Sequence, residues 1–125
     1  MAIHESGEDY LESILKLRQQ GKAVRSIDVV ADLGYSKPSV SLGMKRLRES
    51  GHITVDNDGV ISLTEQGEAV AQRIIGRHRA LTEFFVRLGV SREVAEQDAC
   101  KVEHDISEET FEKLMAHAQG GKLPR

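Results

Sequence analysis

One tight turn interrupts a chain whose apolar residues otherwise recur at the three- and four-residue spacing of a helix. Asp56-Asn57-Asp58-Gly59 lies between two short runs, 52–55 and 60–63, and Asp-Gly tolerates the positive φ that a tight hairpin requires. We therefore expect one two-stranded hairpin with strands at 52–55 and 60–63. Because the segments on both sides of it carry the helical spacing, the expected fold class is mainly α.

Capping residues and glycines mark the ends of six helices. The expected helices span residues 5–20, 26–33, 37–50, 65–88, 92–103 and 108–118. Ser26 and Ser36 are the expected N-caps of the second and third helices, and Pro38 lies in a first turn, where its missing N–H costs little. From the second helix we expect Ile27 and Val29 to face the core.

Composition narrows the class of protein further. A chain of 125 residues fits one domain, or one domain with a small appendix. It has no tryptophan and only 4% aromatic residues, so its core must be built from aliphatic side chains, which suits helices better than a β-sandwich. We expect neither a signal peptide nor a membrane span. A single cysteine cannot form an internal disulfide, which indicates a cytoplasmic protein.

The net charge of −3 argues at first against a nucleic-acid-binding protein, but the distribution of charge matters more than the sum. The first 80 residues carry 11 basic and 11 acidic side chains, and the excess of acids lies after them. Residues 37–48 contain four cations and no acid. Taken alone, such a run is as often a solvated helix face as a DNA contact.

The order of elements favours DNA contact as the role of that basic run. Helix, glycine turn, helix and hairpin is the order of a winged helix-turn-helix, whose second helix enters the major groove. The expected DNA contacts lie on this helix or near it: Arg25, Ser36, Lys37, Pro38, Ser39, Ser41, Leu42, Lys45, Arg46 and Arg48. Leu42 could contact a thymine methyl, whereas the last three cations would mostly neutralise phosphate. The alternative is a winged helix used for protein contact.

A second group of polar residues has the donor types of a metal site. Cys100, Glu103 and His104 are three and four residues apart, so they would lie on one face of a helical turn. Thiolate, carboxylate and imidazole suit a transition metal. The alternatives are an ordinary surface pair beside a small buried cysteine, or an enzyme with Cys100 as nucleophile and His104 as base. No third orienting group or glycine-rich loop accompanies that pair, so we do not expect an enzyme.

Three further residues could belong with this group. Asp9 and Glu12 are three residues apart on the first expected helix. His78 lies on the apolar stripe of the helix over 65–88, where a buried imidazole needs a hydrogen-bond partner.

Three segments resemble the diphtheria toxin repressor family of iron- and manganese-dependent regulators. They are Glu8-Asp9-Tyr10-Leu11-Glu12, Arg77-His78-Arg79-Ala80-Leu81 and Asp98-Ala99-Cys100-Lys101-Val102-Glu103-His104. The resemblance implies a DNA-binding domain over 1–70 and a metal-binding and dimerisation domain over 71–125, without the SH3-like domain of longer members. It further implies a metal-dependent repressor of metal-uptake genes that binds a palindromic double-stranded operator as a homodimer.

The same resemblance implies a ligand set: Asp9, Glu12, His78, Cys100, Glu103 and His104. Asp9 matches the manganese-type members, whereas Cys100 matches the iron-type members and stands where manganese-type members have Glu. We therefore expect Mn²⁺ or Fe²⁺, with Co²⁺, Ni²⁺ or Zn²⁺ able to bind in vitro. The alternative function is a metal-independent winged-helix regulator that responds to a small molecule or a protein partner.

The expected dimer interface rests on apolar surface in the last three helices. These helices carry more apolar side chains than so small a domain can bury alone. The residues expected there are Phe84, Phe85, Phe111, Leu114 and Met115.

Overall fold

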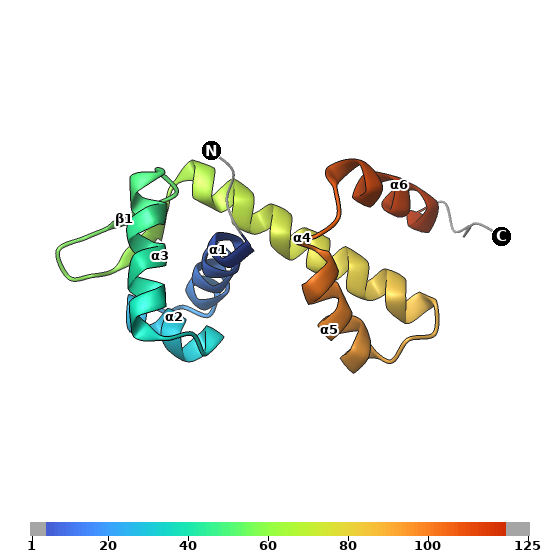
Figure 1. Cartoon of the computed structure of the whole chain (residues 1–125), viewed down its shortest axis with the longest axis horizontal. Coiled ribbons are helices and arrows are strands. Elements are labelled where there is room, and N and C mark those ends of the chain that lie inside the picture. Colours follow the sequence, from blue (N-terminus) through green and yellow to red (C-terminus); the bar gives the residue numbers. More distant parts are fainter. Residues whose placement is uncertain (1–4, 120–125) are drawn as a thin grey trace. The chain divides into compact units, whose positions relative to one another are not determined.

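A computed structural model of the chain describes residues 5–119 (Figure 1). Its elements are α1 (Glu5–Gln19), α2 (Ser26–Leu33), α3 (Lys37–Glu49), β1 (Ile53–Val55), β2 (Ile61–Leu63), α4 (Glu65–Arg87), α5 (Arg92–Val102) and α6 (Glu108–Gln119). The expected mainly helical class is confirmed. The chain divides into two compact units, Met1–Arg73 and Ile74–Arg125. Within the described range no helix is both long enough and apolar enough to cross a membrane.

The first unit contains three helices and a hairpin. α1, α2 and α3 contact one another, and the hairpin contacts α1 through β2 and α3 through β1. Its core is aliphatic apart from Tyr10: Tyr10, Leu11, Ile14, Leu15, Val29, Val40, Met44, Leu47, Ile53 and Ile61 are all buried. In Figure 1 the loop of the hairpin extends away from the three helices. This is the expected winged helix-turn-helix.

The hairpin is shorter by one residue on each strand than expected. β1 and β2 are antiparallel, and the central pair is Thr54 with Ser62. At the turn, the carboxylate of Asp56 accepts hydrogen bonds from the N–H groups of Asp58 and Val60, both at 2.9 Å. His52 keeps one cross-strand bond, from the N–H of Thr64 to its carbonyl, but its own N–H donates to the carbonyl of Leu47. Val60 likewise accepts the N–H of Asp56 but gives its own N–H to the Asp56 carboxylate, and the strands end at Ile53 and Ile61.

Helix capping agrees with the sequence at α3 and differs at α2. Ser36 caps α3 by accepting a hydrogen bond from the N–H of Ser39 at 3.2 Å. The N-cap of α2 is Arg25 and not Ser26, because the carboxylate of Asp28 accepts the Arg25 N–H at 2.9 Å. Ile27 is 54% exposed, which corrects the expectation that it faces the core. Residues two apart point to different sides of a helix, so Ile27 cannot share the buried side of Val29.

Helices α1 and α3 approach closely at Gly43. A Cβ atom at this position would overlap the Tyr10 ring, and would lie 2.7 and 2.9 Å from ring atoms Cδ2 and Cζ. The Tyr10 ring is buried, and its hydroxyl donates a hydrogen bond to the carbonyl of Ser39 at 3.2 Å. The absence of a side chain at Gly43 therefore lets the Tyr10 ring pack closely against α3.

The second unit contains the rest of α4 with α5 and α6. Ile74, Leu81, Ala95 and Ala99 are buried, and Ser91 caps α5. The guanidinium of Arg77 lies 4.9 Å from the ring centre of Phe111 and donates to the carbonyl of Ile106 at 2.9 Å, which joins α4 to the segment around α6. Among the residues expected at a dimer interface, Phe84 is buried within the single chain, and the other four are half-buried.

Candidate metal centre and nucleic-acid interface

The polar side of α3 is presented to solvent. All the residues that were expected to contact DNA are exposed: Arg25, Ser36, Lys37, Pro38, Ser39, Ser41, Leu42, Lys45, Arg46 and Arg48. Val40, Met44 and Leu47 face the core, which leaves the cations on the open side of the helix. Leu42 is 47% exposed on the same side of the helix. Such a surface can meet phosphates and base edges.

The first turn of α3 is held in place before any ligand arrives. The hydroxyl of Ser36 donates to Ser39 Oγ at 2.8 Å while its oxygen accepts the Ser39 N–H. Tyr10 bonds the Ser39 carbonyl from α1. These bonds fix the end of α3 that would enter a groove, and a fixed end loses less entropy on binding.

Arg25 has a role that the sequence did not suggest. Its Nε donates a hydrogen bond to the carbonyl of Asp58 at the hairpin turn, at 3.0 Å. The two residues are 33 positions apart, so no local pattern could have found this contact. Arg25 therefore joins the start of α2 to the tip of the hairpin.

Glu103 forms the buried centre of the second group. It is the C-cap of α5 and its N–H donates to the carbonyl of Ala99 at 2.9 Å, while its side chain is buried at 1% exposure. Its Oε2 lies 2.9 Å from His78 Nδ1 of α4, and its Oε1 lies 3.4 Å from His104 Nε2. Among the described residues, Oε1 accepts no hydrogen bond. The partner that a histidine at position 78 requires is therefore this carboxylate.

A buried carboxylate is costly unless positive or hydrogen-bonding groups surround it. Here one oxygen is bonded to an imidazole, and the other accepts no hydrogen bond from residues 5–119. Carboxylate and imidazole are donors that Mn²⁺, Fe²⁺ and Zn²⁺ accept, so the residues present fit such an ion. Within residues 5–119, however, the structure contains no group of three or more His, Cys, Asp or Glu side chains already arranged to hold a metal.

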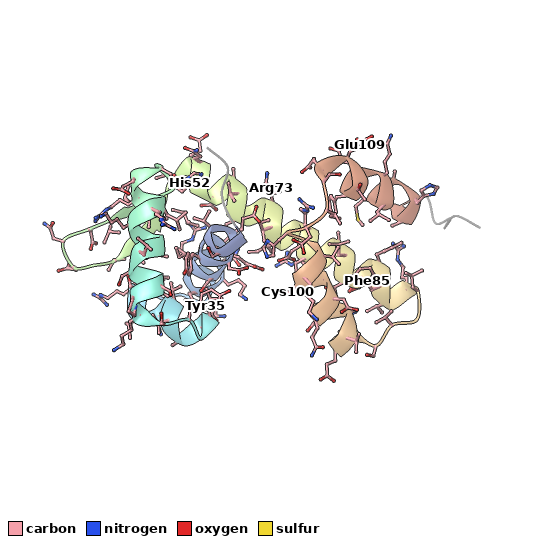
Figure 2. All side chains as sticks on the ribbon, in the orientation of Figure 1. Tyr35, His52, Arg73, Phe85, Cys100 and Glu109 are labelled. Atoms are coloured by element: carbon pink, nitrogen blue, oxygen red, sulfur yellow. The ribbon has the colours of Figure 1, made fainter. Side chains whose placement is uncertain are left out.

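Cys100 is more exposed than its expected neighbour Glu103. α5 ends at Val102, one residue earlier than expected, so His104 lies in the turn that follows and not on the helix. Cys100, labelled in Figure 2, is exposed on α5, whereas the side chains of Glu103 and His104 are buried. The three residues expected to share one helical face therefore differ in exposure.

Asp9 and Glu12 are half-buried on α1, in the first unit. The Asp9 carboxylate accepts a hydrogen bond at 2.9 Å from the hydroxyl of Tyr35. Tyr35, labelled in Figure 2, lies between α2 and α3. Tyr35 was not among the expected functional residues. Its place directly before the Ser36 cap is the only signal that the sequence offered.

Comparisons with known proteins identify the family to which both parts of the chain are similar. Residues 2–60 match the model "Iron dependent repressor, N-terminal DNA binding domain". Residues 64–120 match the model "Iron dependent repressor, metal binding and dimerisation domain". The two matches together cover nearly the whole chain.

Individual relatives agree with these matches. The transcriptional regulator MntR of Salmonella typhimurium is 38% identical over 112 residues, which are 90% of this chain and 71% of the relative. The iron-dependent repressor IdeR of Mycobacterium tuberculosis is 30% identical over 112 residues, 89% of this chain and 49% of the relative.

Solved structures share the fold. A manganese-dependent transcriptional repressor in complex with manganese has a TM-score of 0.81 at 26% identity, and the match covers 95% of this chain and 54% of that one. A hypothetical protein of Sulfolobus solfataricus has a TM-score of 0.73 at 20% identity, over 94% and 91% of the two chains, and this likeness concerns the fold alone. The chain belongs to the iron-dependent repressor family: it is a metal-dependent transcriptional regulator, with an N-terminal DNA-binding domain followed by a metal-binding and dimerisation domain.

Proposed function

We propose that the chain is a repressor of metal-uptake genes, activated by Mn²⁺ or Fe²⁺, which binds a palindromic operator in the cytoplasm as a homodimer. Residues 1–70 would read DNA, and residues 71–125 would bind metal and dimerise. The observation that carries the proposal is the buried Glu103 carboxylate, which has an imidazole near each of its oxygens. The relatives support it, since they include regulators named for manganese and for iron.

The proposed metal ligands are the six residues that the resemblance implies. His78, Glu103 and His104 are the ligands whose contacts support an ion most directly. Asp9 and Glu12 would add carboxylates from α1, and Cys100 would add a thiolate. Carboxylates favour Mn²⁺ and a thiolate favours softer ions, so the mixed set leaves both Mn²⁺ and Fe²⁺ as activators.

The proposed switch depends on charge. When bound, the ion supplies positive charge that Asp9, Glu12 and Glu103 share. In its absence their negative charge would not be neutralised, and α1 would be held less firmly. A firmly held α1 would fix the two DNA-reading units of a dimer at the spacing of half-sites one helical turn apart, about 34 Å. Linkage then requires that operator DNA raise metal affinity by the same factor as metal raises DNA affinity.

The DNA contacts follow from the exposed side of α3. Ser36, Lys37, Pro38, Ser39, Ser41 and Leu42 would face bases and nearby phosphates. Lys45, Arg46 and Arg48 would neutralise phosphates, which positions the protein without specifying sequence. The support for this assignment is their exposure together with the rigid first turn of α3.

The test is DNA binding titrated separately with Mn²⁺, Fe²⁺ and Zn²⁺ under anaerobic conditions, which protect Cys100. The probe is a duplex selected from a random pool by the wild-type protein in saturating Mn²⁺. Glu103→Gln keeps the size of the side chain and removes its charge, so we expect the metal-dependent gain in DNA affinity to be lost while the helical circular dichroism stays. Glu109→Gln makes the same change at an exposed position of α6 and serves as the matched control. Equal metal-dependent binding by both variants would show that Glu103 does not hold the ion.

A further inference from the structure

Two tyrosines link α1 to the start of α3. Tyr35 donates a hydrogen bond to Asp9 Oδ2 at 2.9 Å, and Tyr10, the next residue on α1, donates to the Ser39 carbonyl at 3.2 Å. The two rings pack edge to face, with centres 5.8 Å apart and planes at 81°. All four residues belong to the first unit. The side chain of Asp9 is thus connected through Tyr35 to the residue directly before the Ser36 cap.

Tyr35 lies where a movement of Asp9 can reach the start of α3. Its backbone leads straight into α3, whose first turn is held by the Ser36 cap and by Tyr10. A movement of the Asp9 carboxylate would therefore act on the end of α3 that presents Ser36 and Lys37. A carboxylate can accept a hydrogen bond and ligate a metal at once, because its two oxygens offer several lone pairs. Tyr35 can therefore hold Asp9 while Asp9 binds an ion.

We propose that Tyr35 is a positioning residue that orients Asp9 for the metal and couples metal binding to the start of α3. The inference rests on the proposed function, because it takes Asp9 as a ligand. Partners that orient metal ligands by hydrogen bonding commonly change metal affinity 10- to 100-fold when they are removed. The hydroxyl of Tyr35 has the geometry of such a partner.

The chain offers a matched pair of variants. Tyr35→Phe and Tyr10→Phe each remove one phenol hydroxyl and keep the ring, so the edge-to-face contact stays. Both hydroxyls brace the start of α3, but only the Tyr35 hydroxyl reaches Asp9. A general loosening of α3 would therefore appear in both variants, whereas a metal effect would appear in Tyr35→Phe alone.

The first measurement is calorimetric titration of the full chain with Mn²⁺ in the absence of DNA. We expect Tyr35→Phe to bind Mn²⁺ about tenfold more weakly than the wild type and Tyr10→Phe to bind within about twofold of it. The second is DNA affinity with and without Mn²⁺, using the duplex selected by the wild type. We expect the ratio of the two affinities to fall in Tyr35→Phe and to persist in Tyr10→Phe.

A spectroscopic measurement is independent of both titrations. The chain has two tyrosines and no tryptophan, so the emission of Tyr10→Phe comes from Tyr35 alone. Hydrogen bonding to a carboxylate quenches a phenol, and a cation on that carboxylate weakens the quenching. We expect Zn²⁺, which is not paramagnetic, to raise the emission of Tyr10→Phe and to leave that of Tyr35→Phe unchanged.

The outcomes separate the two proposals. If the wild type binds no Mn²⁺, Fe²⁺ or Zn²⁺, the proposed function fails and this inference fails with it. If the wild type binds metal and both variants match it in affinity and in coupling ratio, the role of Tyr35 is refuted while the proposed function stands. If Tyr35→Phe fails to fold, the emission of Tyr10→Phe decides alone, and an emission indifferent to Zn²⁺ refutes the inference.

Discussion

Replacing Gly43 by alanine tests the closest approach in the first unit. The position is in the middle of α3, where alanine normally stabilises a helix by about 1 kcal/mol over glycine. Here the new Cβ would overlap the buried Tyr10 ring and leave 2.7 and 2.9 Å to two further ring atoms. Either the ring must move away from Gly43, or α1 and α3 must move apart.

The expected magnitude follows from three contributions. Overpacking a core costs about 1–3 kcal/mol, and displacing the ring also loses the hydrogen bond from Tyr10 to Ser39, worth about 1 kcal/mol. The greater helix propensity of alanine offsets about 1 kcal/mol of this cost. We therefore expect Gly43→Ala to lower the free energy of unfolding of the first unit by about 1–3 kcal/mol.

The assay is urea unfolding of the full chain, followed by tyrosine emission and by far-ultraviolet circular dichroism. Both tyrosines lie in the first unit, so their emission reports on that unit, whereas circular dichroism reports on all helices. Gly76→Ala is the matched control. It makes the same change inside α4, where an added Cβ meets nothing within 4 Å, and it should stabilise by about 1 kcal/mol.

A double variant isolates the cause. With Tyr10→Ala already present, Gly43→Ala should change from destabilising to neutral or stabilising, because the obstructing ring is gone. If Gly43→Ala alone stabilises as much as Gly76→Ala, the close packing of α1 on α3 is refuted.

Three further predictions concern Gly67, His52 and the cations of α3. Gly67→Ala should cost more stability than Gly43→Ala in urea unfolding, since its Cβ would overlap the backbone carbonyl of His52, which cannot turn away as a ring can. Burial lowers the pKa of His52, so as the pH drops below about 6.5 the unfolded chain takes up the proton before the folded chain does, and the free energy of unfolding decreases. Urea titrations at pH 7.5 and 5.5 should show a smaller decrease for His52→Gln than for the wild type. Lys45→Ala and Arg48→Ala should each weaken DNA binding for all sequences alike and reduce the slope of log affinity against log salt by about 1, and an unchanged slope would remove that residue from the phosphate contacts.

Local signals predicted the helices and the hairpin because their causes lie within a few residues. Ser36 needs only the Ser39 N–H to cap α3, and Asp56 needs only the next four residues to close the turn. The cap of α2 was assigned to Ser26, because the sequence does not reveal that Asp28 already satisfies the Arg25 N–H. Local rules allow both caps, and the surrounding packing selects one.

Local sequence signals predict less of the candidate metal site than of the fold. Helical spacing predicts Cys100, Glu103 and His104 on one face, but α5 ends at Val102, and the side chains of Glu103 and His104 are buried while Cys100 is exposed. The need of His78 for a partner was visible from its apolar surroundings. Which carboxylate meets it is decided by the packing of α4 against α5, and the bond from Tyr35 to Asp9 likewise crosses 26 residues.

The bond from Arg25 to the hairpin ends on a backbone carbonyl, and this matters for how such proteins diversify. A carbonyl is present whatever side chain occupies position 58, so the anchor survives substitution of the loop. The two aspartates at positions 56 and 58 differ in this respect, since the Asp56 side chain closes the turn and the Asp58 side chain is exposed. Position 58 is thus a site at which the side chain can change its charge without breaking either the anchor from Arg25 or the turn.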